Sequence, residues 1–120
     1  AAGHNSPSTA SVSANAEVGL HPIDLSNSNS VTVSFSNNTY TKTHNGYGNA
    51  TATSEVNVKI GDENRRWDGG STPNSDETWD VSNVDSATME FSAIADTYAS
   101  YSGDEAAADS RLTISDINIS

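Results

Sequence analysis

The stretch Val31-Thr32-Val33-Ser34-Phe35 alternates apolar and polar side chains, and Val56-Asn57-Val58-Lys59-Ile60 repeats the pattern. Successive side chains of a β-strand point to opposite faces, so each stretch predicts a strand with one buried face. Alternation of this kind covers residues 10–18, 31–35, 50–60, 87–95 and 112–119, with short additional strands near residues 23–25 and 79–81. The best helix candidate, Ala106-Ala107-Ala108, is short. We therefore predict an all-β chain of about six or seven strands.

The dipeptide Asn45-Gly46 lies between the two quoted stretches. Asn-Gly favours a two-residue type I′ turn, because both central residues of that turn need positive φ. A turn centred there pairs residues whose numbers add up to 91. This register matches apolar with apolar residues and polar with polar residues: Phe35 with Val56, Val33 with Val58, Val31 with Ile60, Thr32 with Lys59 and Ser34 with Asn57. We predict a long hairpin over residues 30–61.

A second hairpin is predicted at Gly103-Asp104, where glycine supplies positive φ. Its register pairs Ala95 with Leu112, Ala93 with Ile114 and Asp96 with Arg111. The apolar phase of the last strand then shifts from Leu112 and Ile114 to Ile117 and Ile119. One extra residue near Ser115-Asp116 predicts a β-bulge, after which Phe91 would meet Ile117 and Met89 would meet Ile119.

Two long hairpins with one apolar face each must bury those faces, and face-to-face packing is the economical solution. We predict an antiparallel β-sandwich. The sequence leaves open whether its connections are those of a jelly roll or of an immunoglobulin-like fold, although the Cys-Trp-Cys pattern of antibody domains is absent. We divide the chain into an N-terminal strand segment, residues 1–21, and a β-sandwich domain, residues 22–120.

The chain of 120 residues carries 16 acidic and 5 basic side chains, for a net charge of −11. This charge repels nucleic acid and anionic lipid surfaces, so we expect neither as a partner. The absence of cysteine excludes disulfides, thiolate zinc sites and cysteine nucleophiles. No apolar run approaches the roughly 20 residues of a membrane helix, so no membrane span is expected.

Residues 61–76 form the longest turn-like segment, with Trp67 as its one apolar residue. Exposed aromatic rings beside polar groups often stack on and hydrogen-bond sugar rings. The candidate ligand-binding residues are Arg65, Arg66, Trp67, Asp68, Trp79 and Tyr47. The alternative is a structured connection, in which Trp67 packs over one end of the sandwich and the arginines neutralise nearby carboxylates.

Calcium is the one metal that the sequence brings into consideration. Asp62 and Asp68, with Glu63 and Asp76, could supply oxygen ligands, but the spacing of an EF-hand loop is absent. Solvated acidic side chains are the alternative, and we expect no cofactor. His4, His21 and His44 show no zinc-type pairing, and no strained nucleophile turn is present, so we expect no enzyme.

Two further surface features are expected from the pattern. The predicted registers place Tyr40 opposite Thr51 and Tyr98 opposite Asp109, on the polar faces of the hairpins, so both rings should point outward. Asn37, Asn49 and Asn118 each begin a match to the glycosylation pattern, but a chain this rich in Asn, Ser and Thr produces such matches by chance.

The alternation near the start of the chain concerns Ala10, Val12, Ala14, Ala16 and Val18. Terminal segments of Ser, Ala and Asn normally fray, so a strand pattern here requires a sheet edge to hold it. That edge lies either in the same molecule or in the next one. In the second use the pattern resembles the donated strand of subunits in donor-strand-complemented pili, over about the first 18 residues.

We therefore expect a non-enzymatic structural protein, located outside the cell or on the surface of a cell or virion. It would be the subunit of a filament, fibre or coat, and its partners would be copies of itself. The alternative is a monomeric carbohydrate-binding module that uses exposed Trp and Tyr side chains on a glycan.

Overall fold

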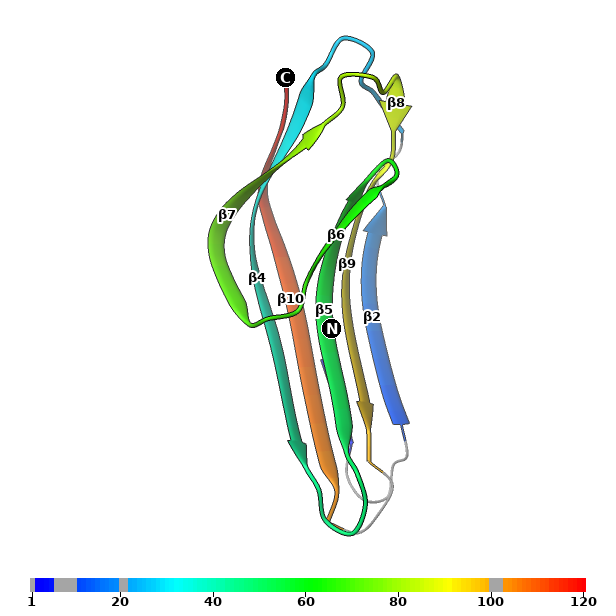
Figure 1. The fold of residues 1–120 in the computed structure, drawn as a ribbon, viewed down its shortest axis with the longest axis vertical. Helices are drawn as coiled ribbons and strands as arrows, with labels where there is room; N and C mark the ends of the chain where they lie inside the picture. Colours follow the sequence, from blue (N-terminus) through cyan, green and yellow to red (C-terminus); the bar gives the residue numbers. More distant parts are fainter. Residues whose placement is uncertain (1, 6–10, 20–21, 100–102) are drawn as a thin grey trace.

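A computed structural model describes residues 2–5, 11–19, 22–99 and 103–120, with residues 2–5 and 11–18 described by their backbone alone. Two four-stranded antiparallel sheets pack face to face in an elongated molecule of 58 × 24 × 17 Å (Figure 1). One sheet has the order β1 (Ala2–Asn5), β10 (Glu105–Ile119), β4 (Ser30–His44), β7 (Ser71–Asp80). The other has the order β2 (Ser11–Gly19), β9 (Met89–Tyr98), β5 (Thr51–Ile60), β6 (Glu63–Trp67). The all-β fold and the antiparallel sandwich are confirmed.

A small sheet of β3 (Ile23–Asp24) and β8 (Ser86–Ala87) lies at one end of the sandwich (Figure 1). The opposite end carries residues 45–50, which we call the first arch, and the described residues 99 and 103–104, which belong to the second arch; we call this end the arch end. None of the described residues forms a helix of the length and hydropathy that crossing a bilayer requires.

The described strands form one long antiparallel ribbon that reverses at Gly61-Asp62. Gly61 has φ +62°, a conformation that favours glycine, and β5 pairs with β6 across this turn. Earlier strands then pair with later ones in reverse order: β4 with β7, β3 with β8, β2 with β9 and β1 with β10. This pairing, rolled up into two four-stranded sheets, is the arrangement of a jelly roll.

Both predicted hairpins are wrong. β4 pairs with β10 and β7, whereas β5 pairs with β6 and β9, so these consecutive strands lie in different sheets. Their apolar rows do meet, but across the interior, where Val33, Phe35 and Val58 belong to one buried cluster. An apolar match satisfies strands that face each other through a core as well as strands that lie side by side, and this is why the register match was misleading.

The connections at the arch end are held by a carboxylate instead of a tight turn. Within the described residues the only non-glycine with positive φ is Asn74, so Asn45 does not adopt the type I′ conformation. The side chain of Asn45 accepts a hydrogen bond from the Ala50 amide at 2.8 Å. Asp104, fully buried, accepts two further bonds through Oδ1, from the Gly46 amide at 2.6 Å and the Gly48 amide at 3.1 Å. Asp104 therefore ties the two arches together.

The positive φ predicted for Gly103 is confirmed at +80°. A Cβ atom at this position would lie 3.3 Å from Gly46 Cα, so the two arches also pack closely here. The predicted hairpin at Gly103-Asp104 nevertheless does not form, because β9 and β10 lie in different sheets.

The β-bulge near Ser115-Asp116 is confirmed as a register shift between Ile114 and Asp116. Its partner strand is β4 and not β9, so Ile117 lies opposite Val33 and Ile119 opposite Val31. The pairing of Asp96 with Arg111 is wrong for the same reason: Asp96 lies opposite Thr53 and Ser13. Arg111 lies opposite Asn38.

The segment 61–76 is mostly strand instead of a long loop. β6 and β7 occupy it, and residues 68–70 carry the chain from one sheet to the other. Thr39 of β4 holds this crossing: its amide donates to the Gly70 carbonyl at 3.1 Å, and its hydroxyl accepts from the Gly70 amide at 2.9 Å. The chain therefore changes sheet at a fixed point halfway along β4.

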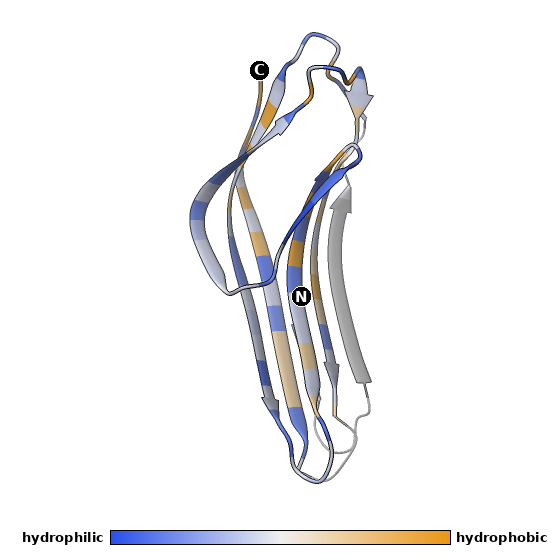
Figure 2. Ribbon diagram, viewed as in Figure 1, coloured by the Kyte–Doolittle hydropathy of each residue, from blue (hydrophilic) through white to orange (hydrophobic). Residues whose placement is uncertain are grey.

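The interior is uneven along the long axis. Large apolar side chains fill the half near β3 and β8, among them Phe35, Trp79 and Met89, and the deepest orange in Figure 2 lies in that half. Towards the arch end the buried cluster consists of Ala50, Ala99 and Ala106. Buried polar residues complete this thinner half, namely Asn37, Thr39, Ser54, Thr97, Asp104 and Ser110.

Two double-cysteine variants separate the observed pairing from the hairpin expected from the sequence. Lys42 on β4 is the direct partner of Ala107 on β10, and a disulfide requires Cα atoms about 4.4–6.8 Å apart. We expect Lys42→Cys with Ala107→Cys to lose both free thiols on mild oxidation, as measured by thiol titration. The control, Thr32→Cys with Lys59→Cys, joins opposite sheets and should keep its thiols free; the reverse result would support the hairpin.

The role of Asp104 is tested by its removal. Asp104→Ala leaves the amides of Gly46 and Gly48 without their acceptor, and we expect the free energy of unfolding to fall by about 2 kcal/mol in urea denaturation. Asp104→Asn keeps a carbonyl-type oxygen and should lose about 1 kcal/mol. Equal stability of both variants and the native chain would show that the arches do not depend on this side chain.

Candidate interaction surfaces

The N-terminal strand β2 is an edge strand of its sheet. All nine of its residues pair with β9 of the same chain. The positions of β2 with alternating apolar residues have these partners on β9: Val12 lies opposite Thr97, Ala14 opposite Ala95, Ala16 opposite Ala93 and Val18 opposite Phe91. Ala10 lies outside the described residues. Three of these four β9 partners are buried. The alternating apolar positions of β2 therefore lie opposite the inward-facing residues of β9.

Arg65 is fully engaged within its own fold. Its guanidinium lies 4.1 Å above the Trp79 ring and donates to the Thr78 carbonyl at 2.8 Å. It also forms ion pairs with Glu63 at 3.3 Å and Glu77 at 3.4 Å. Stacking on tryptophan and pairing with two carboxylates bind the end of β7 to β6.

Arg66 and Asp68 form a second cluster on the outer surface. Arg66 pairs with Glu55 of β5 and with Asp68, both at 3.2 Å. A shallow depression of about 270 Å³ lies beside them, lined also by Thr53, Ile94 and Asp96. Arg66 neutralises local carboxylates, as the alternative interpretation of this segment expected.

The two tryptophans belong to the interior. Trp79 is 0% exposed and cannot stack on a ligand at the surface. Trp67 is half-buried, with its ring centroid 4.8 Å from that of Phe35 and an angle of 55° between the rings. Trp67 therefore packs over the core from the end of β6.

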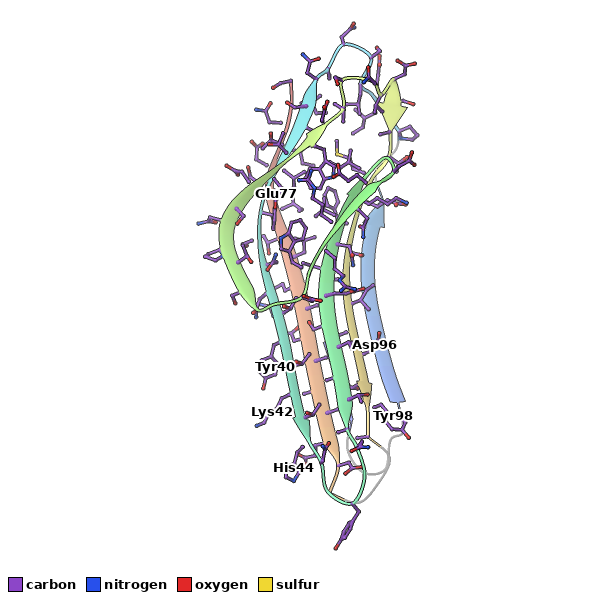
Figure 3. The ribbon with its side chains drawn as sticks, viewed as in Figure 1. Tyr40, Lys42, His44, Glu77, Asp96 and Tyr98 are labelled. Carbon is purple, nitrogen blue, oxygen red and sulfur yellow. The ribbon has the colours of Figure 1, made fainter. Side chains whose placement is uncertain are left out.

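Among the described residues three tyrosines are exposed, but they do not form one platform. Tyr47 is 88% exposed in the first arch. Tyr40 and Tyr98 point outward, as expected, from opposite sheets of the sandwich (Figure 3). Their predicted partners were exchanged: Tyr40 lies opposite Asp109, and Tyr98 lies opposite Thr51.

The two calcium candidates are separated by the length of a strand. Asp62 precedes β6 and Asp68 follows it, and six steps of about 3.3 Å place them about 20 Å apart. Asp62 borders an open pocket of about 290 Å³ at the β3 and β8 end, whose rim also carries Glu63 and Asp80. The described residues contain no group of three carboxylates or histidines arranged to hold a metal ion.

Asp80 and Asp24 act locally as turn caps. The backbone and side chain of Ser82 hydrogen-bond to Asp80 and lower the pKa of its carboxyl group. The side chain and backbone of Ser26 lower the pKa of Asp24 in the same way. Both carboxylates stabilise turns at the β3 and β8 end.

The remaining candidates are dispersed. His44 is exposed at the end of β4, His4 lies on β1, and His21 lies outside the described residues. Among the glycosylation matches, Asn37 is only 6% exposed, so its amide is inaccessible in the folded chain. Asn49 and Asn118 are exposed.

The open sheet edges were not foreseen from any sequence pattern. In the described part of the chain no strand pairs with the outer side of residues 111–119 of β10, because β1 covers only residues 106–109. Residues 40–44 of β4 have no pairing with β7, and residues 51–55 of β5 have no pairing with β6, so each strand has an open edge there as well. Only the pairing of β1 with β10 reveals the first edge, and no local pattern encodes that pairing.

Trp67→Ala separates a packing role from a ligand-binding role. Removal of a ring that packs on Phe35 should lower the free energy of unfolding by about 3 kcal/mol, measured by urea denaturation. The control Tyr47→Ala removes an exposed ring and should change it by less than about 0.5 kcal/mol. If Trp67→Ala left stability unchanged, the ring would be free for a ligand instead.

The chain matches no known protein family, no curated protein and no solved structure. The function of these surfaces must therefore be inferred from their own geometry and chemistry.

Proposed function

We propose that this protein is a non-enzymatic structural subunit that assembles with copies of itself by exchange of its N-terminal strand. The assembly would be a filament, fibre or coat outside the cell or on the surface of a cell or virion. The observation that carries the proposal is the position of β2, a nine-residue edge strand near the start of the chain that pairs with β9 alone.

An edge strand can leave its sheet without breaking any pairing between the remaining strands. Removal of β2 leaves β9, β5 and β6 paired as before and exposes the free edge of β9. The β2 strand of another copy can fill that edge in the same register, from Ser11 opposite Tyr98 to Gly19 opposite Glu90. Because the exchanged strand forms the same hydrogen bonds and packing as the original one, exchange costs only the rearrangement of the hinge and the loss of free motion.

The N-terminal segment reaches both sheets. β1 lies at the edge of one sheet beside β10, and β2 lies at the edge of the other beside β9. A copy that receives both strands from a neighbour is therefore joined to it through both layers of the sandwich. Donation that passes from each copy to the next, without closing on itself, builds a linear fibre.

The alternative function, a carbohydrate-binding module, has less to support it. Trp79 is buried and Arg65 is engaged by Trp79 and two carboxylates. Tyr47 is the most exposed aromatic side chain among the described residues. Jelly rolls include both viral capsid and lectin domains, so the fold favours neither function.

Single-cysteine variants test strand exchange in the full chain. Ser13 and Asp96 are partners across β2 and β9. Ser13→Cys mixed with Asp96→Cys can form a disulfide between two different chains only if β2 of one copy pairs with β9 of another. We expect this mixed dimer on non-reducing gels after incubation under conditions that favour assembly.

The matched control is Ser13→Cys mixed with Thr53→Cys. Thr53 lies on the same row one strand further in, opposite Asp96, so no mixed dimer should form. The double variant Ser13→Cys with Asp96→Cys reports pairing within one chain. An internal disulfide there, no mixed dimer from the single variants and a monomer in sedimentation at every concentration would refute the proposal.

A further inference from the structure

The first arch contains the only Asn-Gly dipeptide of the chain, Asn45-Gly46. In such a dipeptide the backbone nitrogen of glycine can attack the side-chain carbonyl carbon of asparagine, because glycine has no Cβ atom to shield that nitrogen. The attack closes a cyclic imide and releases ammonia. The reaction is ordinarily slow, since a backbone amide is a poor nucleophile until a base removes its proton.

A carboxylate lies directly against the nitrogen that would attack. Asp104 Oδ1 is 2.6 Å from the Gly46 amide nitrogen and accepts its hydrogen bond. The Asp104 side chain is fully buried, and the same oxygen accepts a second bond from the Gly48 amide at 3.1 Å, which fixes its position. A general base must lie within about 2.6–3.2 Å of the atom whose proton it takes. Asp104 meets this requirement at Gly46.

A hydrogen-bond donor lies at the other reacting group. Asn45 Oδ1 accepts a hydrogen bond from the Ala50 amide at 2.8 Å. This oxygen gains negative charge during the attack, and a backbone N–H group about 2.7–3.1 Å away stabilises such a charge. Asn45 itself is exposed, so ammonia can leave the site and water can reach it. The Ala50 amide therefore lies where a donor to the oxyanion is required.

Asn49 provides a comparison within the same arch. It is exposed, like Asn45, but the residue that follows it is Ala50 instead of glycine. The Ala50 amide donates to the side chain of Asn45 and not to a carboxylate. Asn49 therefore lacks the base at the following nitrogen that Asn45 has.

We propose that Asn45 is a site of self-catalysed deamidation, with Asp104 as the general base and the Ala50 amide as the donor to the oxyanion. Asp104 takes the amide proton of Gly46 while the Gly46 nitrogen bonds to Asn45 Cγ, and the electron pair of the Cγ=Oδ1 bond moves to Oδ1. When that pair returns, the bond from Cγ to Nδ2 breaks. The proton held by Asp104 passes to Nδ2, which leaves as ammonia.

Water then opens the imide in one of two ways. Attack at Cγ leaves aspartate at position 45, and attack at the backbone carbonyl carbon leaves isoaspartate, whose main chain runs through the former side chain. The net reaction consumes a water molecule and releases an ammonia molecule, and it needs no oxidant, cofactor or second protein. Either product adds a negative charge beside Asp104, so the contact between the two arches should weaken.

The same hydrogen bonds could have the opposite effect. An ordered loop slows this reaction when its bonds hold the attacking nitrogen away from the carbonyl carbon, because the reacting atoms must approach in a defined geometry. Catalysis by Asp104 predicts faster conversion of Asn45 in the folded chain than in the unfolded chain. Protection predicts slower conversion, so a comparison of the two rates separates the effects.

The full native chain is incubated under native conditions and in concentrated guanidinium chloride, at the same pH and temperature. Conversion is followed by mass spectrometry of proteolytic peptides, as the mass shift of an amide replaced by a carboxyl group. We expect Asn45 to be converted at least about tenfold faster in the folded chain, because only that state places the base and the donor. Asn49 is the internal control and should be converted much more slowly than Asn45 in both states.

Asp104→Asn separates the base from the hydrogen-bond acceptor. The amide oxygen of the variant can still accept from Gly46 and Gly48, but it does not serve as a base. Conversion of Asn45 in the folded variant should fall on the order of a hundredfold, the lower end of what a positioned general base contributes. Urea denaturation establishes that the variant is folded under the incubation conditions; the native comparison decides the question if it is not.

Faster conversion in the folded native chain, together with slow conversion in Asp104→Asn, would support the proposal. Slower conversion in the folded than in the unfolded native chain would overturn it, because the hydrogen bonds would then protect Asn45. Equal conversion in the native chain and in folded Asp104→Asn would overturn it as well. The reaction leaves β2 paired with β9, so the cross-link between Ser13→Cys and Asp96→Cys tests strand exchange separately.

Discussion

The reversal of the chain at Gly61-Asp62 sets the order in which the second half of the chain pairs with the first. Once β6 pairs back on β5, the second half of the chain retraces the first: β4 with β7, β3 with β8, β2 with β9 and β1 with β10. Paired residue numbers add up to 110 in β4 and β7, where Ser30 meets Asp80, and to 111 in β1 and β10, where Ala2 meets Asp109. In β5 and β6, where Val56 meets Trp67, the total is 123, so the first half of the ribbon carries more residues between β4 and β5 than the second half carries between β6 and β7.

Rolling this ribbon into two layers brings the apolar rows of consecutive strands face to face, and the interior differs along its length. Valine, phenylalanine, tryptophan and methionine bury a large apolar area near β3 and β8. At the arch end the layers are held by alanine contacts and by the hydrogen bonds of Asp104. There a buried carboxylate accepts hydrogen bonds from two loop amides and stabilises the contact between the layers, which apolar packing stabilises at the other end.

The sequence predicted the strands well and their partners poorly. Alternation located the inward residues of β4, β5, β9 and the end of β10, and the phase shift after Ile114 located the bulge. It could not distinguish a neighbour in the same sheet from one across the core, because Phe35 and Val56 satisfy both arrangements. Asn45-Gly46 added a local preference for a turn, which the bonds from Gly46 and Gly48 to Asp104 overrode. Asp104 lies 58 positions from Gly46, beyond the reach of any local pattern.

The roles of the surface residues were likewise predicted only where they do not depend on strand order. The packing role of Trp67 and the neutralisation by Arg66 were among the interpretations of residues 61–76, because composition alone suggested both. The burial of Trp79 and the open edge of β10 depend on strand order, which requires the whole ribbon.

The pairing of β1 and β2 with the last strands has a consequence for the order in which the molecule can form. On a ribosome, β1 and β2 are made before the other strands described here, and β9 and β10, which pair with them, are made after those strands. Ala2 cannot pair until its partner Asp109 has been added to the chain. Throughout that interval β1 and β2 have no partner, and pairings so distant in sequence form slowly even afterwards. The timing of synthesis thus leaves the N-terminal strands open longest to capture by a neighbouring chain.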